Sequence, residues 1–319
     1  MEGVYFTLIN LILPNMIQHL LQISDLDRTH LENLLTAAQR IAQQPARSLA
    51  QRLLDHTLVN LFYENSTRTR VSFELAAKRL GAHVINVDVK TSSVQKGESL
   101  LDSILTLQAM GCDFLVMRHP QEDIGTSLIP HLHPTLHLIN AGDGCHAHPT
   151  QALLDMFTLL QHGVDFTKLS VAIVGDTLHS RVTNSQLAAF DLLGTRDIRI
   201  IGPAELLPTD LPFSYVKTST DLVNGLQGVD VIMLLRIQRE RMPSIMLPDA
   251  GDYFAHYGLT QKRLALANPK AVIMHPGPVN VNVEIAETLV YHAQSTVLQQ
   301  VTNGVLLRTA LLDQWAKNK

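Results

Sequence analysis

Three hydroxyl side chains, Ser66, Thr67 and Thr69, stand beside two guanidinium groups, Arg68 and Arg70, in the segment 62–74, which reads FYENSTRTRVSFE. They lie where an apolar, strand-like run gives way to a helical pattern that ends at Gly81. A helix N-terminus offers free amide donors and a positive dipole end, and guanidinium groups bind anions strongly. Arginine in a first helical turn opposes the dipole, so the segment favours an anion site, most naturally for phosphate, over a simply capped helix.

Further polar residues follow other apolar runs. Arg118 follows the predicted strand 113–117, and a loop with His148 and Gln151 follows the predicted strand 136–140. In open α/β sheets, ligands bind at the carboxyl ends of strands. These groups should therefore meet the 66–70 segment at one site.

The alternation of strand-like and helical runs starts again after a predicted helix at 149–160. Strands are expected at 171–174, 198–201, 229–235 and 271–274, with a helix at 220–226. We predict an α/β fold with two doubly wound parallel-sheet domains linked by helices, and a C-terminal helix packing back on the first domain. The expected boundaries are 16–148, completed by about 292–319, and 149–291, with residues 1–15 as an extension.

Two local expectations concern the ends of the chain. The helix that contains Leu31 and Leu34 should be capped by Ser24 or Asp25. The tail from Glu284 to Trp315 is expected to be helical.

The composition points to a soluble globular enzyme. The 319 residues are 46% hydrophobic and 17% charged, with a formal net charge of -4 and two cysteines, Cys112 and Cys145. Nothing resembles the broad basic stripe of a nucleic-acid surface, and the apolar N-terminal run is too short to span a bilayer. With no disulfide framework, a cytoplasmic location is expected.

Seven ordered motifs run through nearly the whole chain: FYENSTRTRVSFE, SVQKGES, VMRHP, HPTQALLD, VGDTLHSR, LRIQRER and HPGPVN. In this order they resemble the catalytic chains of the aspartate carbamoyltransferases, in the aspartate/ornithine carbamoyltransferase superfamily. The resemblance implies transfer of the carbamoyl group from carbamoyl phosphate to L-aspartate, in pyrimidine biosynthesis. It implies neither a metal nor another cofactor.

The resemblance also implies residue roles in the first half. The catalytic residues would be Arg68, Thr69, Arg118 and His148. Carbamoyl phosphate would be bound by Ser66, Thr67, Arg68, Thr69, Arg118, His148 and Gln151, together with the 276–278 loop of Pro276, Gly277 and Pro278. A histidine before a proline at a helix start is often only a cap, but Gln151 one turn along on the same face favours a place for His148 in the site.

The resemblance assigns the binding of aspartate to Arg181, Arg236 and Gln238 in the second half, together with Lys96 of the first half. Ser92 and Lys96 would reach the site of a neighbouring subunit, which makes a homotrimer the expected unit, with or without regulatory or dihydroorotase-like chains. Glu64 and Arg241 would link the domains on closure, with Glu64 close to Arg181.

The nearest alternative is ornithine carbamoyltransferase. That family typically carries HCLP where this chain has His275, Pro276, Gly277 and Pro278, so the cysteine is missing. Two arginines placed for carboxylates favour aspartate. One departure within the preferred family is Val281, where related chains often have arginine.

Three further alternatives are weaker. Gly142, Gly144 and Ala147 form a GxGxxA pattern, but without a suitably placed acidic residue for a nucleotide. The histidines 131, 133, 137, 146 and 148 have no common zinc spacing. A catalytically silent scaffold is disfavoured by the intact motifs.

Overall fold

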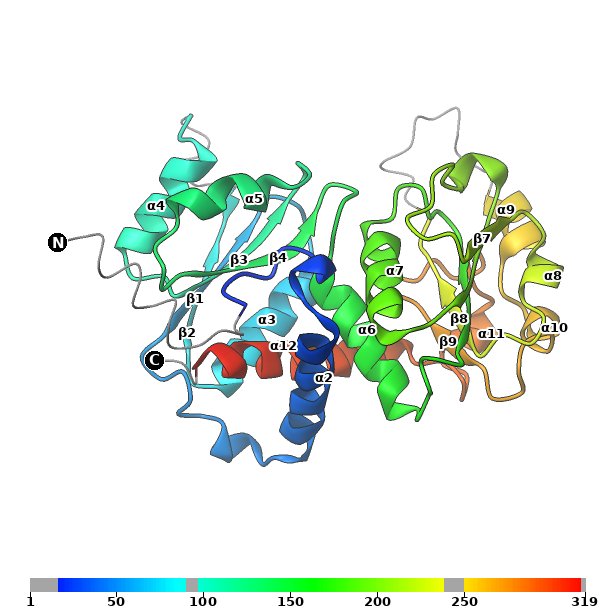
Figure 1. Ribbon diagram of the computed structural model, residues 1–319, viewed down its shortest axis with the longest axis horizontal. Helices are drawn as coiled ribbons and strands as arrows, with labels where there is room; N and C mark the ends of the chain where they lie inside the picture. The colour runs from blue at the N-terminus through cyan, green and yellow to red at the C-terminus, as the bar shows by residue number, and fades with distance from the viewer. Residues whose placement is uncertain (1–16, 90–96, 238–249, 317–319) are drawn as a thin grey trace.

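The computed structural model describes residues 17–89, 97–237 and 250–316, and shows two lobes, each built on a parallel sheet (Figure 1). The two sheets have four and five strands, and every strand pair is parallel. The predicted fold class is therefore confirmed. Within the described ranges, no helix is long and apolar enough to cross a membrane.

The first sheet has the order β2-β1-β3-β4. Its strands are β1 (Thr57–Phe62), β2 (His83–Val87), β3 (Phe114–His119) and β4 (His137–Asp143). Helices of this lobe are α2 (Arg28–Gln43), α3 (Thr67–Arg79), α4 (Leu100–Ala109) and α5 (Ile124–Leu128). The central strand β1 is apolar and buried along most of its length, as a strand covered on both faces must be.

The second sheet has the order β7-β6-β5-β8-β9. Its strands are β5 (Ser170–Val174), β6 (Asp197–Ile201), β7 (Val216–Ser219), β8 (Val231–Leu234) and β9 (Val272–Met274). The helices are α7 (Arg181–Leu193), α8 (Leu222–Gly225), α9 (Ala250–Tyr257), α10 (Gln261–Leu264) and α11 (Glu287–Val290).

Both strand orders reverse direction at one place. The chain runs outward from β1 to β2 and returns to β3, and likewise runs from β5 through β6 to β7 and returns to β8. Connections leave in opposite directions at such switch points, so a crevice opens at the carboxyl ends of the strands on either side. The loops after β1, β3, β5 and β8 therefore carry the residues of any site.

Two long helices join the lobes (Figure 1). Helix α6 (Pro149–Gln161) leads from the first lobe to the second, and α12 (Val297–Ala316) returns to pack against α2, α3 and α6. Eleven of the thirteen residues of α6 are buried, because other helices cover it on several sides. The predicted return of the C-terminal helix to the first lobe is confirmed.

Two local expectations were wrong, and one strand was missed. Helix α2 begins later than expected, with Asp27 as its cap, because Asp25 instead accepts bonds from the Leu21 and Gln22 amides. The tail is not one helix: α11 and α12 are separated where Thr296 N–H donates to Ile273. Strand β7 escaped detection because it is a short edge strand with polar residues, VKTS.

Candidate active site

The N-terminus of α3 opens into the crevice. Ser66 is the N-cap residue with extended backbone, and its hydroxyl makes no capping bond, which leaves it to a ligand. Thr69 is buried, and its carbonyl accepts a 2.8 Å bond from the Ser72 hydroxyl. Burial, and after it the positive charge of Arg236, lowers the pKa of Arg68. Arg68 and Arg236 come from different lobes and repel one another across an open space. An anion bound between them would reduce this repulsion.

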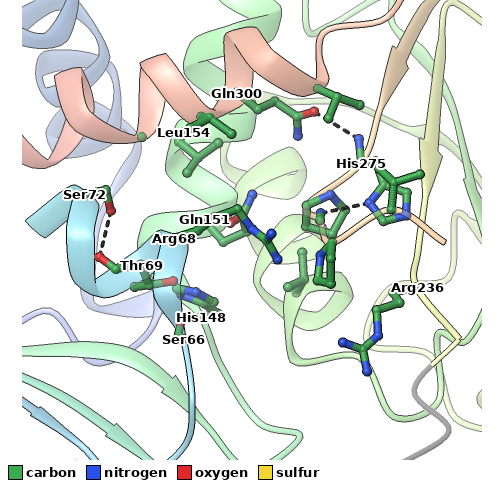
Figure 2. A pocket seen from close by; sticks show the side chains of 18 of the residues that line it. Ser66, Arg68, Thr69, Ser72, His148, Gln151, Leu154, Arg236, His275 and Gln300 are labelled. Atoms are coloured by element: carbon green, nitrogen blue, oxygen red, sulfur yellow. Dashed lines mark hydrogen bonds between the residues drawn. The ribbon is translucent and has the colours of Figure 1, made fainter. Parts of the chain in front are cut away.

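A cavity of about 670 Å³ occupies this space. Its walls come from both lobes and from α12, and Figure 2 shows Arg68, His148, Gln151 and Arg236 around it. The described residues that line it include five arginines, Arg68, Arg118, Arg181, Arg236 and Arg308, and no Asp or Glu. Such a cavity suits ligands with more than one negative group.

Glu64 binds two of these arginines from behind. Its Oε2 accepts a 2.7 Å bond from Arg181 Nη2 and a 3.1 Å bond from Arg118 Nε. Arg118 donates further to the Ala141 carbonyl, and Arg181 to the Gly144 carbonyl. The two guanidinium groups are therefore held in place while part of each still faces the cavity.

Gly142 makes this arrangement sterically possible. Its φ is +115°, and a Cβ there would lie 3.0 Å from Arg181 Cζ and 3.3 Å from Arg118 Nη1. The glycine pattern in this loop therefore serves the close approach of two arginines.

His148 is a buried, neutral imidazole. Burial, followed by the charges of Arg118, Arg181 and Arg308, holds its pKa well below the ordinary value. Its side chain does not cap α6, and Nδ1 has no hydrogen-bond partner among the described residues. The interpretation of His148 as a simple helix cap is therefore wrong. A neutral ring that borders the cavity can donate one N–H to a ligand oxygen.

A buried carboxylate lies behind Gln151. Asp155 accepts hydrogen bonds from the amides of Gln151 (3.0 Å), Gln186 (2.6 Å) and Gln300 (2.9 Å). These residues belong to α6, α7 and α12, so one acid joins three helices. Gln300 in turn accepts from the His275 amide at 3.0 Å, a bond drawn in Figure 2.

Arg308 of α12 is a fifth cation at the cavity. Its Nη2 donates to Thr150 Oγ1 at 3.0 Å and its guanidinium lies 4.9 Å from the centre of the Phe73 ring. Burial lowers its pKa to about 9 even though Asp155 acts in the opposite direction. It remains protonated at neutral pH and adds positive charge to the floor of the cavity.

The loop after β9 closes one side. His275 Nδ1 accepts from the Gly277 amide at 2.8 Å, so this ring nitrogen is unprotonated. Gly277 has φ +68°, and a Cβ there would lie 3.1 Å from Arg68 Cζ. Glu284 accepts from the amides of Asn280 and Ile237, which ties this loop to the segment after Arg236.

Most of the predicted binding residues line the one cavity. They are Ser66, Thr67, Arg68, Thr69, Arg118, His148, Gln151, Arg181, Arg236, Pro276, Gly277 and Pro278. Glu64 contacts Arg181, as the motif resemblance implied. Ser92, Lys96, Gln238 and Arg241 lie outside the described residues, as does the expected extension 1–15. Val281 borders the cavity and is exposed.

Sequence reasoning missed Asp155, Gln300 and Arg308. Asp155 was available as an acid one turn beyond Gln151 in HPTQALLD, on the same helix face. Gln300 and Arg308 carried no comparable signal, because only the packing of α12 brings them to the cavity.

The histidines considered for a metal have separate surroundings. His137 stacks on Trp315 with ring centres 4.7 Å apart, His146 bonds to Asp143, and His148 borders the cavity. Over the ranges that the structure describes, no group of three His, Cys, Asp or Glu side chains is arranged to hold a metal ion.

Comparison with known proteins shows the family of this chain. Residues 18–161 match the carbamoyl phosphate-binding domain of the aspartate/ornithine carbamoyltransferases, and residues 167–315 match their aspartate/ornithine-binding domain. The chain is an enzyme of the carbamoyltransferase class and belongs to the aspartate/ornithine carbamoyltransferase family.

Solved structures of this family superpose over most of the chain. Aspartate transcarbamoylase from Trypanosoma cruzi, in complex with carbamoyl aspartate and phosphate, is 29% identical with a TM-score of 0.81, covering 94% of this chain and 95% of that one. The same enzyme in complex with N-(phosphonacetyl)-L-aspartic acid is 28% identical with a TM-score of 0.81, covering 94% of each chain. Ornithine carbamoyltransferase from Thermus thermophilus is 25% identical with a TM-score of 0.82, covering 94% and 99%.

Proposed function

We propose that this chain transfers the carbamoyl group of carbamoyl phosphate to the amino group of L-aspartate, giving N-carbamoyl-L-aspartate and phosphate. The observation that carries the choice of aspartate is the charge of the cavity: five arginines and, among the described residues, no acid line it. The side chain of ornithine is cationic and would find no counter-charge there. Two anionic substrates would each be stabilised.

The phosphate would bind at the α3 N-terminus, with Ser66, Thr67, Arg68 and Thr69. Arg181 and Arg236 would bind the carboxylates of aspartate, assisted by Gln238. Guanidinium groups suit both partners, because a planar fork matches phosphate and carboxylate oxygens. In this proposal residues 16–148 with about 292–319 bind carbamoyl phosphate, and residues 149–291 bind aspartate.

The neutral α-amino group of aspartate attacks the carbonyl carbon, a tetrahedral oxyanion forms, and phosphate leaves with the C–O bond electrons. The proton of the amine passes to the departing phosphate. Thr69, Arg118 and His148 donate to the oxyanion, and Gln151 together with the backbone carbonyls of the 276–278 loop holds the carbamoyl amide. Positioning and electrostatics supply the rate enhancement.

Ser92 and Lys96 complete the site of a neighbouring subunit in this proposal, so the working unit is a homotrimer in the cytoplasm, serving pyrimidine biosynthesis. Glu64 and Arg241 link the two lobes when the site closes around both substrates.

Two measurements test the proposal. Carbamoyl transfer is assayed with aspartate and with ornithine as acceptor, and faster transfer to ornithine overturns the choice of aspartate. Binding of N-(phosphonacetyl)-L-aspartate is then measured by calorimetry for the native chain, Arg68→Ala and Arg236→Ala. Each variant should bind at least about 100-fold more weakly, because each loses a charged hydrogen-bond donor to one end of the ligand. Unchanged affinity in both variants rules out the two-anion site.

A further inference from the structure

Asp155 does not line the cavity. It nevertheless determines whether the oxygen or the NH2 group of the Gln151 side chain faces a bound ligand. A carboxylate accepts hydrogen bonds and cannot donate them when it is ionised. The Gln151 side chain must therefore turn its NH2 group toward Asp155, at 3.0 Å, and leave Oε1 for the cavity that it lines. Among the described residues, no donor reaches Gln151 Oε1.

The orientation is reinforced by the other two amides. Gln300 donates its NH2 group to the same Asp155 oxygen at 2.9 Å, while its own oxygen accepts from the His275 amide. Both the NH2 group and the oxygen of the Gln300 side chain are therefore hydrogen-bonded. A flip of this amide would break both bonds, so Gln300 keeps donating to Asp155 Oδ1. Gln186 donates to the other oxygen, Oδ2, at 2.6 Å.

Asp155 has the burial that this role requires. Its side chain is fully buried, and it forms hydrogen bonds with amides and no ion pair within the described residues. Bulk solvent does not reach its oxygens, which favours one arrangement of the three amides. The cavity wall at Gln151 is consequently a hydrogen-bond acceptor, and it can be satisfied only by a ligand that carries an N–H or O–H donor.

We propose that Asp155 is the positioning residue that makes this site select an acyl phosphate with an NH2 group over one with a methyl group of the same size. The inference rests on the proposed function, because it takes carbamoyl phosphate as the ligand that meets Gln151. A methyl group would leave the buried Oε1 without a donor, which is costly, whereas the carbamoyl NH2 satisfies it.

The test uses two stable phosphonates that differ only in this group, phosphonoacetamide, with NH2, and acetonylphosphonate, with CH3. Dissociation constants are measured by calorimetry on the assembled native protein. We expect the amide to bind at least about tenfold more tightly, the difference that one satisfied buried oxygen makes.

Asp155→Ala should reduce the ratio of the two constants at least about threefold, because water in the vacated space donates as readily as it accepts. The backbone carbonyls of the 276–278 loop still accept from the NH2 group, so part of the preference should remain. Asp155→Asn should keep the ratio. Its oxygen can still accept from Gln151 and Gln300. Gln186, whose Oε1 has no hydrogen-bond partner among the described residues, can turn over and accept from the new NH2 group.

Asp313→Asn is the matched control. Asp313 is a buried acid on α12 that accepts a hydrogen bond from Arg52 and does not line the cavity, so its variant should leave the ratio unchanged. In a Gln151→Ala background, adding Asp155→Ala should not change the ratio of the two dissociation constants any further. If Asp155 instead stabilised the site in a general way, the second substitution would lower the ratio again. If Asp155→Ala does not fold, Asp155→Leu combined with Gln186→Leu removes the acid and one donor together and gives the same readout.

The outcomes separate the two claims. If the native protein binds neither phosphonate, the proposed function fails. If it binds both equally, or if Asp155→Ala keeps the native ratio, Asp155 does not set the selectivity and the inference is overturned.

Discussion

The Glu64 carboxylate accepts a 2.7 Å hydrogen bond from the Arg181 guanidinium, across 117 positions of the sequence. This bond joins the loop after β1 to the first residue of α7, and therefore joins the two lobes at the crevice. The same oxygen holds Arg118. One acid thus keeps two cations close together that would otherwise repel each other.

Glu64→Ala should lower kcat/KM for aspartate by about 10- to 100-fold, because Arg118 and Arg181 lose the carboxylate that orients them. Steady-state kinetics with aspartate as the varied substrate checks this. Glu32→Ala is the control, since Glu32 pairs with Arg28 on the exposed surface. Unchanged or improved use of aspartate by Glu64→Ala would contradict the orienting role.

His148 should remain neutral throughout the working range, because burial and three arginines lower its pKa. Its ring signals in an NMR titration should therefore stay constant from pH 8 down to pH 6. A transition of the His148 ring near pH 6.5 would show that the ring gains a proton there and would remove the neutral donor.

His148→Ala should reduce kcat by about 100-fold, the usual loss of one oxyanion donor. The affinity for phosphonoacetamide should change far less if the bond strengthens mainly in the transition state. His148→Gln, which retains an N–H donor, should recover part of the rate. Equal rates for the Ala and Gln variants would argue against donation by this side chain.

Gly142→Ala should reduce kcat/KM at least about tenfold, because its Cβ would press on the guanidinium groups of Arg181 and Arg118. Gly163→Ala is a matched control: it also has positive φ, +71°, but a Cβ there meets nothing within 4 Å. The control should lose stability and retain activity. Equal loss of activity in both variants would assign the effect to backbone strain alone.

Asp155 should make stability depend on pH. Burial raises its pKa to about 6, whereas an unfolded Asp has a pKa of about 3.9. Between these values the folded chain holds more protons, so the free energy of unfolding falls as the pH rises, by about 3 kcal/mol in all.

Asp155→Asn cannot titrate at this position. From pH 4 to pH 7 its unfolding free energy should therefore rise relative to the native chain by about 2 to 3 kcal/mol. Urea unfolding at several pH values measures this difference, and the pH dependence common to both proteins cancels. A constant difference across the range would mean that Asp155 keeps an ordinary pKa when folded.

The sequence by itself determined the elements and the chemistry that they carry. Apolar runs and helical spacing placed α6 and β5 within about a residue of their observed bounds, because burial on several sides imposes a strong local pattern. The STRTR segment indicated an anion site for a local reason as well, the unfavourable charge of arginine at a helix start.

Only the tertiary structure decided which residues share the cavity. Gln300 and Arg308 lie on α12, more than 140 positions from Asp155 and Thr150, to which they donate, so no local pattern could pair them. Edge strand β7 and the break before α12 were missed because polar side chains and one long-range bond shape them. The orientation of Gln151 depends on the buried Asp155 carboxylate, which accepts hydrogen bonds from three side-chain amides. These amides come together only when three helices are packed against one another.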